Sequence, residues 1–331
     1  MPKASQQDLA KLLEISQAAV SKALRGDPTI SEKVRSRVKD LADKLNYRPN
    51  RLARSLIDGR APIVGLVMPQ IFGAVASILL SEIERHLREL GYLPLVVQIH
   101  TWDKDNRELI ELLLEYKVQG IIVFLLSPSW EQDFFQELID SGEKIVFFNN
   151  SGIPEACCVA SDDRKGAAAV VSHLIGLGHR DIAFCWSNTP ESAGGLRLAG
   201  YRDILRSHDL PEKILDVSQS ATETILKKLL KQDSQITAVF CADDNIAVDF
   251  EASLFKLKVP VPDQISLVGF GDNFYHPDAM RTPMTTVSHQ PRLMAEKAVK
   301  LFSDMVAGRK PRGVKLIPCQ MICRHSVKDL R

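Results

Sequence analysis

The chain has 331 residues, of which 45% are hydrophobic, so it is long enough to bury more than one core. The net charge of +1 is unevenly distributed: residues 1–60 hold 13 Lys and Arg against 7 Asp and Glu, and the rest hold 29 against 34. Residues 1–60, of which the first 49 are called the head below, are therefore basic, and the rest of the chain, called the body, is acidic. This asymmetry favours a partner that carries phosphates and binds the basic residues 1–60. No secretory signal or membrane-spanning apolar run is found, which argues against an exported or membrane protein and predicts a cytoplasmic one.

The head begins with two short helical patterns joined by a tight turn. Ser5 and the carboxylate three residues later form a capping-box pattern before the first apolar stripe. Ser16 is predicted to cap a second helix over residues 17–25, on which Val20 and Leu24 face the first helix. The sequence therefore predicts a helix-turn-helix. The alternative is a small helical bundle without a DNA-binding role, which can show the same pattern.

The second helix is the candidate for reading DNA. A helix in the major groove reads base edges with its exposed side chains, while serines and N-terminal amides contact phosphates. A third helix follows, beginning at Ser31, with Val34, Val38 and Leu41 in its predicted buried stripe. The candidate DNA-binding residues of the head are Ser16, Gln17, Ala18, Ser21, Lys22, Arg25 and Ser31.

A short basic segment follows the head. Pro49 interrupts the chain, and Asn50 can cap an eight-residue helix that ends before Gly59. A helix this short is unstable alone, so we expect it to form only when docked, with Leu56 as a wedge in a minor groove. An ordinary interdomain linker is the alternative. The candidate DNA contacts of this segment are Asn50, Arg51, Ala53, Arg54 and Leu56.

From Pro62 onward, short β-branched runs alternate with helical patterns. Such alternation predicts parallel sheets with helices on both faces, and the length predicts two lobes with a ligand at the carboxyl ends of the strands. The tail is expected to cross back between the lobes. Strands are predicted at residues 63–68, 95–99, 121–126, 145–148, near 159, 182–185, 214–217, 238–241, 265–268 and 314–318. Helices are predicted at residues 75–90, 105–116, 131–141, 163–177, 192–208, 222–231, 245–257 and 291–307.

The head and the basic segment together resemble the DNA-binding domain of the lactose-repressor (LacI/GalR) family of bacterial transcription regulators. The matching residues are Asp8, Ala10, Ser16, Val20-Ser21-Lys22, Ile30-Ser31, Val34, Asn46-Tyr47, Pro49-Asn50 and Leu52-Ala53-Arg54-Ser55-Leu56. The resemblance implies a homodimer that reads a near-palindromic operator in double-stranded DNA, with Gln17, Ala18 and Lys22 at the principal base-reading positions. The sequence departs from the family at residues 13–15 and at Ala19, which we expect to alter affinity more than fold.

The resemblance continues into the body, through motifs such as Arg197-Leu198-Ala199-Gly200-Tyr201 and Leu267-Val268-Gly269-Phe270. It implies an all-α helix-turn-helix head on an α/β body of two doubly wound parallel-sheet lobes, like a type I periplasmic binding protein. The expected regulator, a repressor, responds to a small-molecule effector bound between the lobes. The expected divisions are residues 1–49 for the head, 50–61 for the hinge helix and linker, and 62–331 for effector binding and dimerisation. One lobe is expected over about 62–158 and 291–318, and the other over about 159–290 and 319–331.

Effector contacts are carried over only where positions match. Arg197 matches the family arginine that binds effector oxygens, and Asp244 is expected to cap a helix rather than contact the ligand. Several family carboxylates are replaced, which weakens the case for a plain hexose and leaves a modified sugar, a polyol, a nucleoside or another metabolite open. The candidate effector-binding residues are Gln70, Phe72, Asn149, Arg197, Asp243 and Asp272.

Two other classes of function fit the sequence less well. A solute-binding protein shares the two-lobed body but needs an export signal and no basic head. A nucleotide-dependent enzyme needs a glycine-rich phosphate turn after its first strand, and Met68–Phe72 has none. No cofactor is expected. Cys319, Cys323 and His325 lack the spacing of a zinc site, so the six cysteines are predicted to be thiols.

Overall fold

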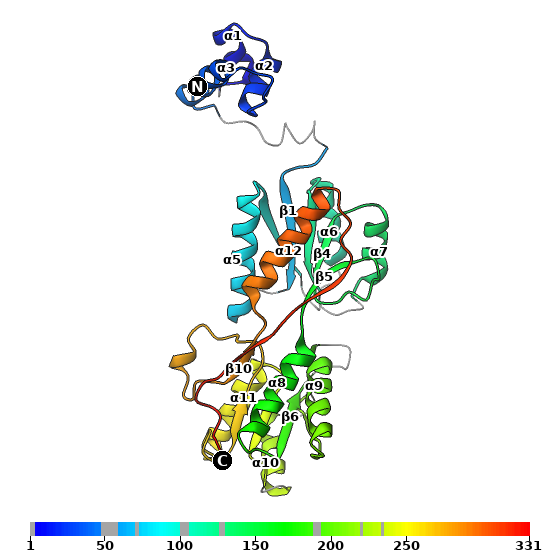
Figure 1. Cartoon of the computed structure of the whole chain (residues 1–331), viewed down its shortest axis with the longest axis vertical. Coiled ribbons are helices and arrows are strands. Elements are labelled where there is room, and N and C mark those ends of the chain that lie inside the picture. The colour runs from blue at the N-terminus through cyan, green and yellow to red at the C-terminus, as the bar shows by residue number, and fades with distance from the viewer. Residues whose placement is uncertain are drawn as a thin grey trace. The chain divides into compact units, whose positions relative to one another are not determined.

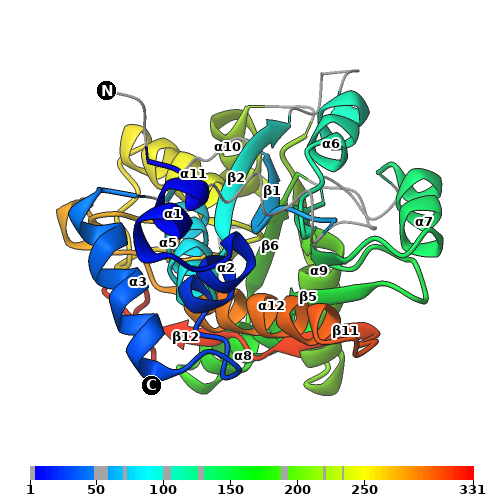
Figure 2. The same cartoon turned by 90° about the horizontal axis from the view of Figure 1, so that it is seen from above.

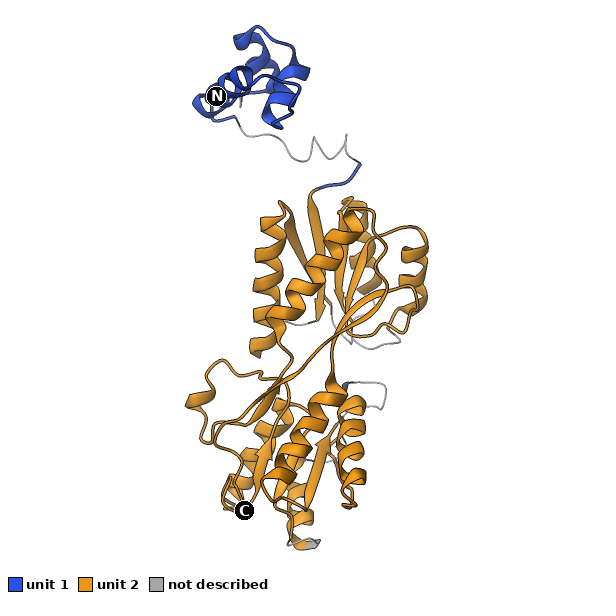
Figure 3. Ribbon diagram, in the orientation of Figure 1, with its two compact units in different colours: residues 1–61 blue, residues 62–331 orange. Residues whose placement is uncertain are grey.

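The computed structural model describes residues 4–47, 59–69, 73–99, 106–125, 130–187, 193–218, 221–232 and 235–331. The chain forms two compact units, residues 1–61 and 62–331 (Figure 3), and each is described by itself below. Within the described residues no helix combines the length and the apolar character that crossing a bilayer would require.

Residues 4–47 of the smaller unit form three helices, α1 (Gln6–Leu13), α2 (Gln17–Leu24) and α3 (Glu32–Lys44). The predicted capping box at the start of α1 is confirmed: the Ser5 hydroxyl accepts from the Asp8 amide, and the Asp8 carboxylate accepts from the Ser5 amide. The core of this unit is small and drawn from all three helices. Its buried members are Leu9, Ala10, Val20, Ala23, Val38 and Ala42.

The larger unit begins with a six-stranded sheet in the order β11-β5-β4-β3-β1-β2, and every pairing in it is parallel. Its strand β1 has five consecutive buried residues, as expected for a strand covered on both faces. The strands are β1 (Ile63–Pro69), β2 (Leu93–Ile99), β3 (Gly120–Phe124), β4 (Ile145–Phe148), β5 (Cys157–Ser161) and β11 (Gly313–Ile317).

Helices cover both faces of this sheet, as Figure 1 and Figure 2 show. Helices α5 (Gly73–Glu89) and α12 (Pro291–Val306) pack over one core, which includes Leu66 and Phe302. Helices α6 (Asn106–Glu115) and α7 (Gln132–Asp140) pack over the other. The predicted alternation of strands and helices is thus confirmed for this lobe.

The second sheet has the order β7-β6-β8-β9, again parallel throughout. Two isolated bridges, Val268 to Thr285 and Gly271 to Ser288, connect it to an antiparallel pair, β10 with β12. The strands of this lobe are β6 (Ile182–Trp186), β7 (Lys213–Asp216), β8 (Ala238–Cys241), β9 (Ser266–Val268), β10 (Thr286–Ser288) and β12 (Gln320–Ile322). Its helices are α8 (Asp163–Gly176), α9 (Ala193–Ser207), α10 (Thr222–Gln232) and α11 (Asp244–Lys256), and it also contains a 3₁₀ turn, η1 (Pro277–Ala279).

The chain passes between the two sheets three times: from β5 to α8, from β10 to α12, and from β11 to β12. Strand β5 ends at Ser161, beyond the lobe boundary expected at 158/159, because residues 159–161 continue to pair with β11. Each passage is short, so residues on all three segments meet. These residues form the larger unit's candidate site.

Candidate functional site

The exposed face of α2 carries the polar side chains that the sequence singled out. Gln17, Ala18, Lys22 and Arg25 are exposed, and Ser21 is half-buried. Val20 on the opposite face is fully buried, as the helical spacing predicted. The helix therefore presents an amide, a methyl group and cations on its outer surface while its apolar face holds the bundle together.

Ser16 and Ser31 are both helix N-caps, but they are held differently. The Ser16 hydroxyl accepts from the Ala19 amide at 3.1 Å, which confirms the predicted cap. The Ser31 side chain makes no capping hydrogen bond. Both residues are exposed. The Ser31 hydroxyl, unlike that of Ser16, is therefore not committed to its own helix.

Seven predicted contacts lie outside the described residues. They are Asn50, Arg51, Ala53, Arg54, Leu56, Gln70 and Phe72.

Arg197 lies on α9, which follows the strand at the topological switch point of the second sheet. Ligands of doubly wound sheets bind beside such points, at the carboxyl ends of the strands. The Arg197 side chain is only 9% exposed. Its Nη1 donates to the Ala242 carbonyl at 2.6 Å, its Nη2 donates to Asp163 Oδ1 at 3.3 Å, and its guanidinium carbon lies 4.1 Å from the Phe270 ring centroid. Among the described residues its buried Nε has no hydrogen-bond partner, so one donor remains for another group.

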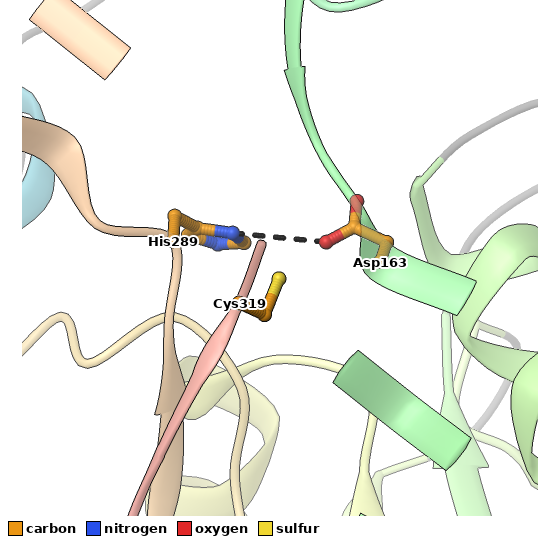
Figure 4. A group of neighbouring side chains, drawn as sticks. All are labelled: Asp163, His289 and Cys319. Carbon is orange, nitrogen blue, oxygen red and sulfur yellow. Dashed lines mark ion pairs between the residues drawn. The ribbon is translucent and has the colours of Figure 1, made fainter. Parts of the chain in front are cut away.

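Asp163, His289 and Cys319 converge beside Arg197, one from each passage between the sheets (Figure 4). We call these three residues the hinge cluster. Ser161 Oγ lies 2.9 Å from Asp163 Oδ1 and 3.2 Å from His289 Nδ1, and so links the two. Burial lowers the pKa of His289 to about 4, with the Arg197 charge contributing, and burial raises the pKa of the Cys319 thiol to about 12. The imidazole and the thiol are therefore both uncharged near neutral pH.

The aspartate that caps the helix after β8 is not the one that the sequence predicted. Asp243, not Asp244, caps α11: its Oδ1 accepts from the Ile246 amide at 3.0 Å. The prediction of Asp244 as the cap was therefore wrong, because the helix begins one residue earlier than expected. Asp244 is buried and accepts from Thr286 Oγ1 at 2.7 Å and from the Asn273 amide at 2.7 Å. Burial raises the pKa of Asp244 to about 6.

Asp272 and Asn149 both adopt left-handed backbone conformations, with φ of 55° and 72°. Asp272 Oδ1 accepts from Arg324 Nη2 at 2.7 Å, so its carboxylate is already paired. Asn149 is exposed at the end of β4. Of the described effector candidates, only Arg197 belongs to the group of side chains around the hinge cluster.

Sequence reasoning missed the hinge cluster. Asp163, His289 and Cys319 are separated by 126 and 30 positions, and no local spacing connects them. The one signal in the sequence was position along the chain: each residue comes within two positions of the end of a strand, namely β5, β10 or β11.

Residues 6–50 match the family described as bacterial regulatory proteins, lacI family, and residues 171–327 match a periplasmic binding protein-like domain. The HTH-type transcriptional regulator GalR of Escherichia coli K12 is 28% identical over 329 residues, which cover 97% of this chain and 94% of GalR. Residues 6–50 therefore form a LacI-family DNA-binding domain, and the chain aligns with GalR over almost its whole length. The HTH-type transcriptional repressor PurR of Vibrio parahaemolyticus is a further LacI-family relative, 25% identical over 98% of both chains.

Solved LacI-family structures share the fold. The lac repressor dimer bound to operator and the anti-inducer ONPF superposes with a TM-score of 0.83, at 22% identity, over 99% of this chain and all of that one. The transcriptional regulator CelR in complex with cellobiose gives 0.70 at 22% identity, over 98% and 99% of the two chains. The predicted fold class is confirmed. With a LacI-family DNA-binding domain and the regulators GalR and PurR as full-length relatives, the chain is a DNA-binding transcriptional regulator and not an enzyme.

Proposed function

We propose that this LacI-family chain is a homodimeric repressor whose affinity for a near-palindromic operator is set by a small effector bound between the two sheets. The observation that carries the proposal is the outward face of α2, with Gln17, Ala18 and Lys22 exposed around a fully buried Val20. Amide and cationic side chains are the groups that read adenine and guanine edges in a major groove. Because a repressor acts on the chromosome, we expect it in the cytoplasm.

A second copy of the chain is the expected partner, since a near-palindromic operator matches a two-fold axis. The edge strand β2 supports this. It closes one side of its sheet and exposes Leu93, Leu95 and Val96, with exposed fractions of 60%, 38% and 38%. An exposed apolar edge strand tends to pair with another strand or to be buried against another protein surface. We propose that the dimer covers this edge.

The effector site is proposed around Arg197, whose buried Nε retains an unused donor. Asp243 is engaged as a cap and Asp272 is paired with Arg324, so fewer carboxylates are free for paired hydroxyls than a hexose site needs. The solved relatives include complexes with cellobiose and with ribose. We infer a sugar-like ligand that offers an oxygen acceptor to Arg197, with modified sugars, polyols and nucleosides as the classes to test.

The proposed control couples this site to the segment at residues 50–57. An effector that prefers one arrangement of the lobes shifts the population toward it, and a coupling of about 1–3 kcal/mol changes operator affinity several-fold to a hundredfold. Binding of the short segment to the minor groove is the step that this coupling would favour or oppose. Leu56→Ala should therefore weaken operator binding in a mobility-shift assay while leaving effector binding intact.

The DNA-binding proposal is tested by selecting genomic fragments on the full-length chain and measuring affinity for the selected site. Loss of one base contact costs about 1–3 kcal/mol, and the homodimer loses one contact in each half-site, so Lys22→Ala should weaken operator binding at least about thirtyfold and relax preference at one position in each half-site. Lys39→Ala removes the same charge from an exposed position of α3 and is the matched control. Equal losses of operator affinity in both variants would mean that Lys22 contributes only its positive charge and does not read a base.

The effector proposal is tested by repeating the operator titration with a metabolite library. A ligand that changes affinity in the parent chain should lose its effect in Arg197→Gln, while effector-free operator binding is retained. A ligand that acts equally on both chains binds elsewhere and contradicts the placement of the site.

A further inference from the structure

The hinge cluster brings three different metal-binding groups together. Asp163, His289 and Cys319 offer a carboxylate oxygen, an imidazole nitrogen and a thiol sulfur, and these donor atoms all lie within 4.8 Å of one another. Asp163 Oδ1 and His289 Nδ1 are 3.7 Å apart. The Asp163 side chain is 6% exposed and that of His289 is 18% exposed, and Cys319 is also partly buried, so the group is largely shielded from water.

We propose that Asp163, His289 and Cys319 bind a zinc ion. Cysteine sulfur, histidine nitrogen and carboxylate oxygen are each zinc ligands, and zinc sites with three protein ligands keep a fourth position open. Magnesium and calcium prefer oxygen ligands alone, and copper(I) prefers several sulfur ligands. This mixed set of donors therefore favours zinc over all three ions. The inference goes beyond the proposed function, because it concerns an ion rather than the operator or the effector.

The geometry requires a small contraction. Zinc bonds of about 2.0–2.3 Å in a tetrahedron place ligand atoms about 3.3–3.8 Å apart. Asp163 Oδ1 and His289 Nδ1 already meet this separation at 3.7 Å, and because all three donor atoms lie within 4.8 Å, no pair needs to close by more than about 1 Å. Ser161 Oγ donates to Asp163 Oδ1 and orients that carboxylate, whereas its contact with His289 Nδ1 is given up when this nitrogen binds the metal.

Arg197 lies beside the proposed zinc position, and its positive charge would repel the ion. Its Nη2 shares Asp163 Oδ1 at 3.3 Å, whereas its bond to the Ala242 carbonyl and its contact with Phe270 do not involve the cluster. When zinc binds, Cys319 loses its proton to solvent, and the thiolate and the carboxylate together balance the two charges of the ion. Arg197 then gives up its bond to Asp163 and keeps its other two contacts.

Metal binding would also join the three passages between the sheets. Each ligand belongs to a different passage, so a bound ion restrains all three at once. The same ion would free Arg197 Nη2, beside the proposed effector site. Zinc binding itself is measurable without DNA or effector, so its failure and the failure of the proposed function are distinguishable.

The test is a titration of the reduced full-length chain with Co²⁺ and then with Zn²⁺. Cobalt bound to Cys319 should give a thiolate-to-metal charge-transfer band, and zinc should displace it. Calorimetry in buffers of different ionisation enthalpy should show about one proton released per zinc. Cys319→Ser should abolish the band and weaken zinc binding at least about tenfold, and Asp163→Asn should weaken binding by a similar factor.

Cys323→Ser is the matched control. Cys323 is an exposed thiol 3.9 Å from His173 Nε2, so it represents the competing surface pair. It should leave the band and the zinc affinity unchanged. Loss of the band in Cys323→Ser but not in Cys319→Ser would overturn the proposal, as would the absence of a band in the folded parent chain.

Zinc X-ray absorption on the parent chain provides a measurement that needs no variant. One sulfur and otherwise nitrogen or oxygen neighbours are expected. A zinc ion with no sulfur neighbour, or with two, would contradict the assignment even if Cys319→Ser failed to fold.

Discussion

Asp244 is a carboxylate in a site with almost no solvent, 2% exposed. Two hydrogen bonds hold it, from Thr286 Oγ1 and from the Asn273 amide, yet burial dominates and raises the pKa of this group to about 6. The folded chain therefore binds a proton in a pH range where the unfolded chain has already released it. Stability contributed by this group is fully present below about pH 4 and is lost as the pH rises through 6.

Asp244→Asn should remove this dependence. An asparagine can accept from the Asn273 amide and donate to Thr286, as the protonated acid does. The variant should be more stable than the parent at about pH 8, by up to about 3 kcal/mol, and equal to it near pH 4. Urea unfolding followed by circular dichroism at both pH values measures the difference.

Asp243→Asn is the control for the charge change. Asparagine caps helices as well as aspartate, so the start of α11 should be unaffected. A stabilisation of Asp244→Asn that is the same at both pH values would mean that the carboxylate's charge is not the cause.

Neighbouring residues such as Asp243 and Asp244 also show the limit of prediction at this scale. The sequence correctly placed both at the end of β8, where a helix begins. It could not decide which one caps, because that depends on a single backbone position, and the burial of Asp244 depends on residues 29 and 42 positions away.

At the scale of elements, the head depends on local hydrogen bonds because the core formed by its described residues is small, with six buried side chains. The Ser5 hydroxyl and the Asp8 carboxylate cap α1, with the Ser5 amide 2.9 Å from Asp8 Oδ2. That hydrogen bonding lowers the pKa of Asp8. A cap of this kind stabilises a helix by about 1 kcal/mol, a large share of the stability available to a unit of this size.

Ser5→Ala should therefore accelerate amide hydrogen exchange in α1–α3 of the full-length chain about fivefold. Ser31→Ala is the matched change at a cap whose side chain makes no capping bond, and its effect on exchange should be much smaller. If the two substitutions accelerate exchange equally, the capping box contributes nothing specific to α1.

Elements of this kind were predictable because their signals are local. Ser5 and Ser16 stand before apolar stripes of helical period, and the continuous apolar run of β1 predicts a strand buried on both faces. The short strands β10 and β12 were not predicted. Each has three residues, and they pair with one another across more than 30 positions, which no local pattern records.

At the scale of the larger unit, the two lobes touch directly as well as through the three passages. Asn273 Oδ1, after β9 in one lobe, accepts from the Val75 amide in the first turn of α5 in the other, at 3.1 Å. Tyr275 donates to the Gly73 carbonyl at 2.9 Å. Gly73 has φ of 80°, and a β-carbon there would lie 2.2 Å from Asn273 Oδ1, so this approach requires glycine. These contacts join residues about 200 positions apart, so no local sequence pattern could predict them.

The double variant Asn273→Ala, Tyr275→Phe should release the first turn of α5. Two hydrogen bonds, each contributing about 1 kcal/mol, are removed, so the Val75 amide should exchange about tenfold faster or more, while amides in β1 remain protected. Hydrogen exchange with mass spectrometry on the full-length chain measures both. Gly73→Ala should have the same local effect, because it blocks the same contact from the opposite lobe. Acceleration that spreads equally through β1 would indicate general destabilisation, and unchanged exchange at Val75 would mean that the two lobes are not held together at this point.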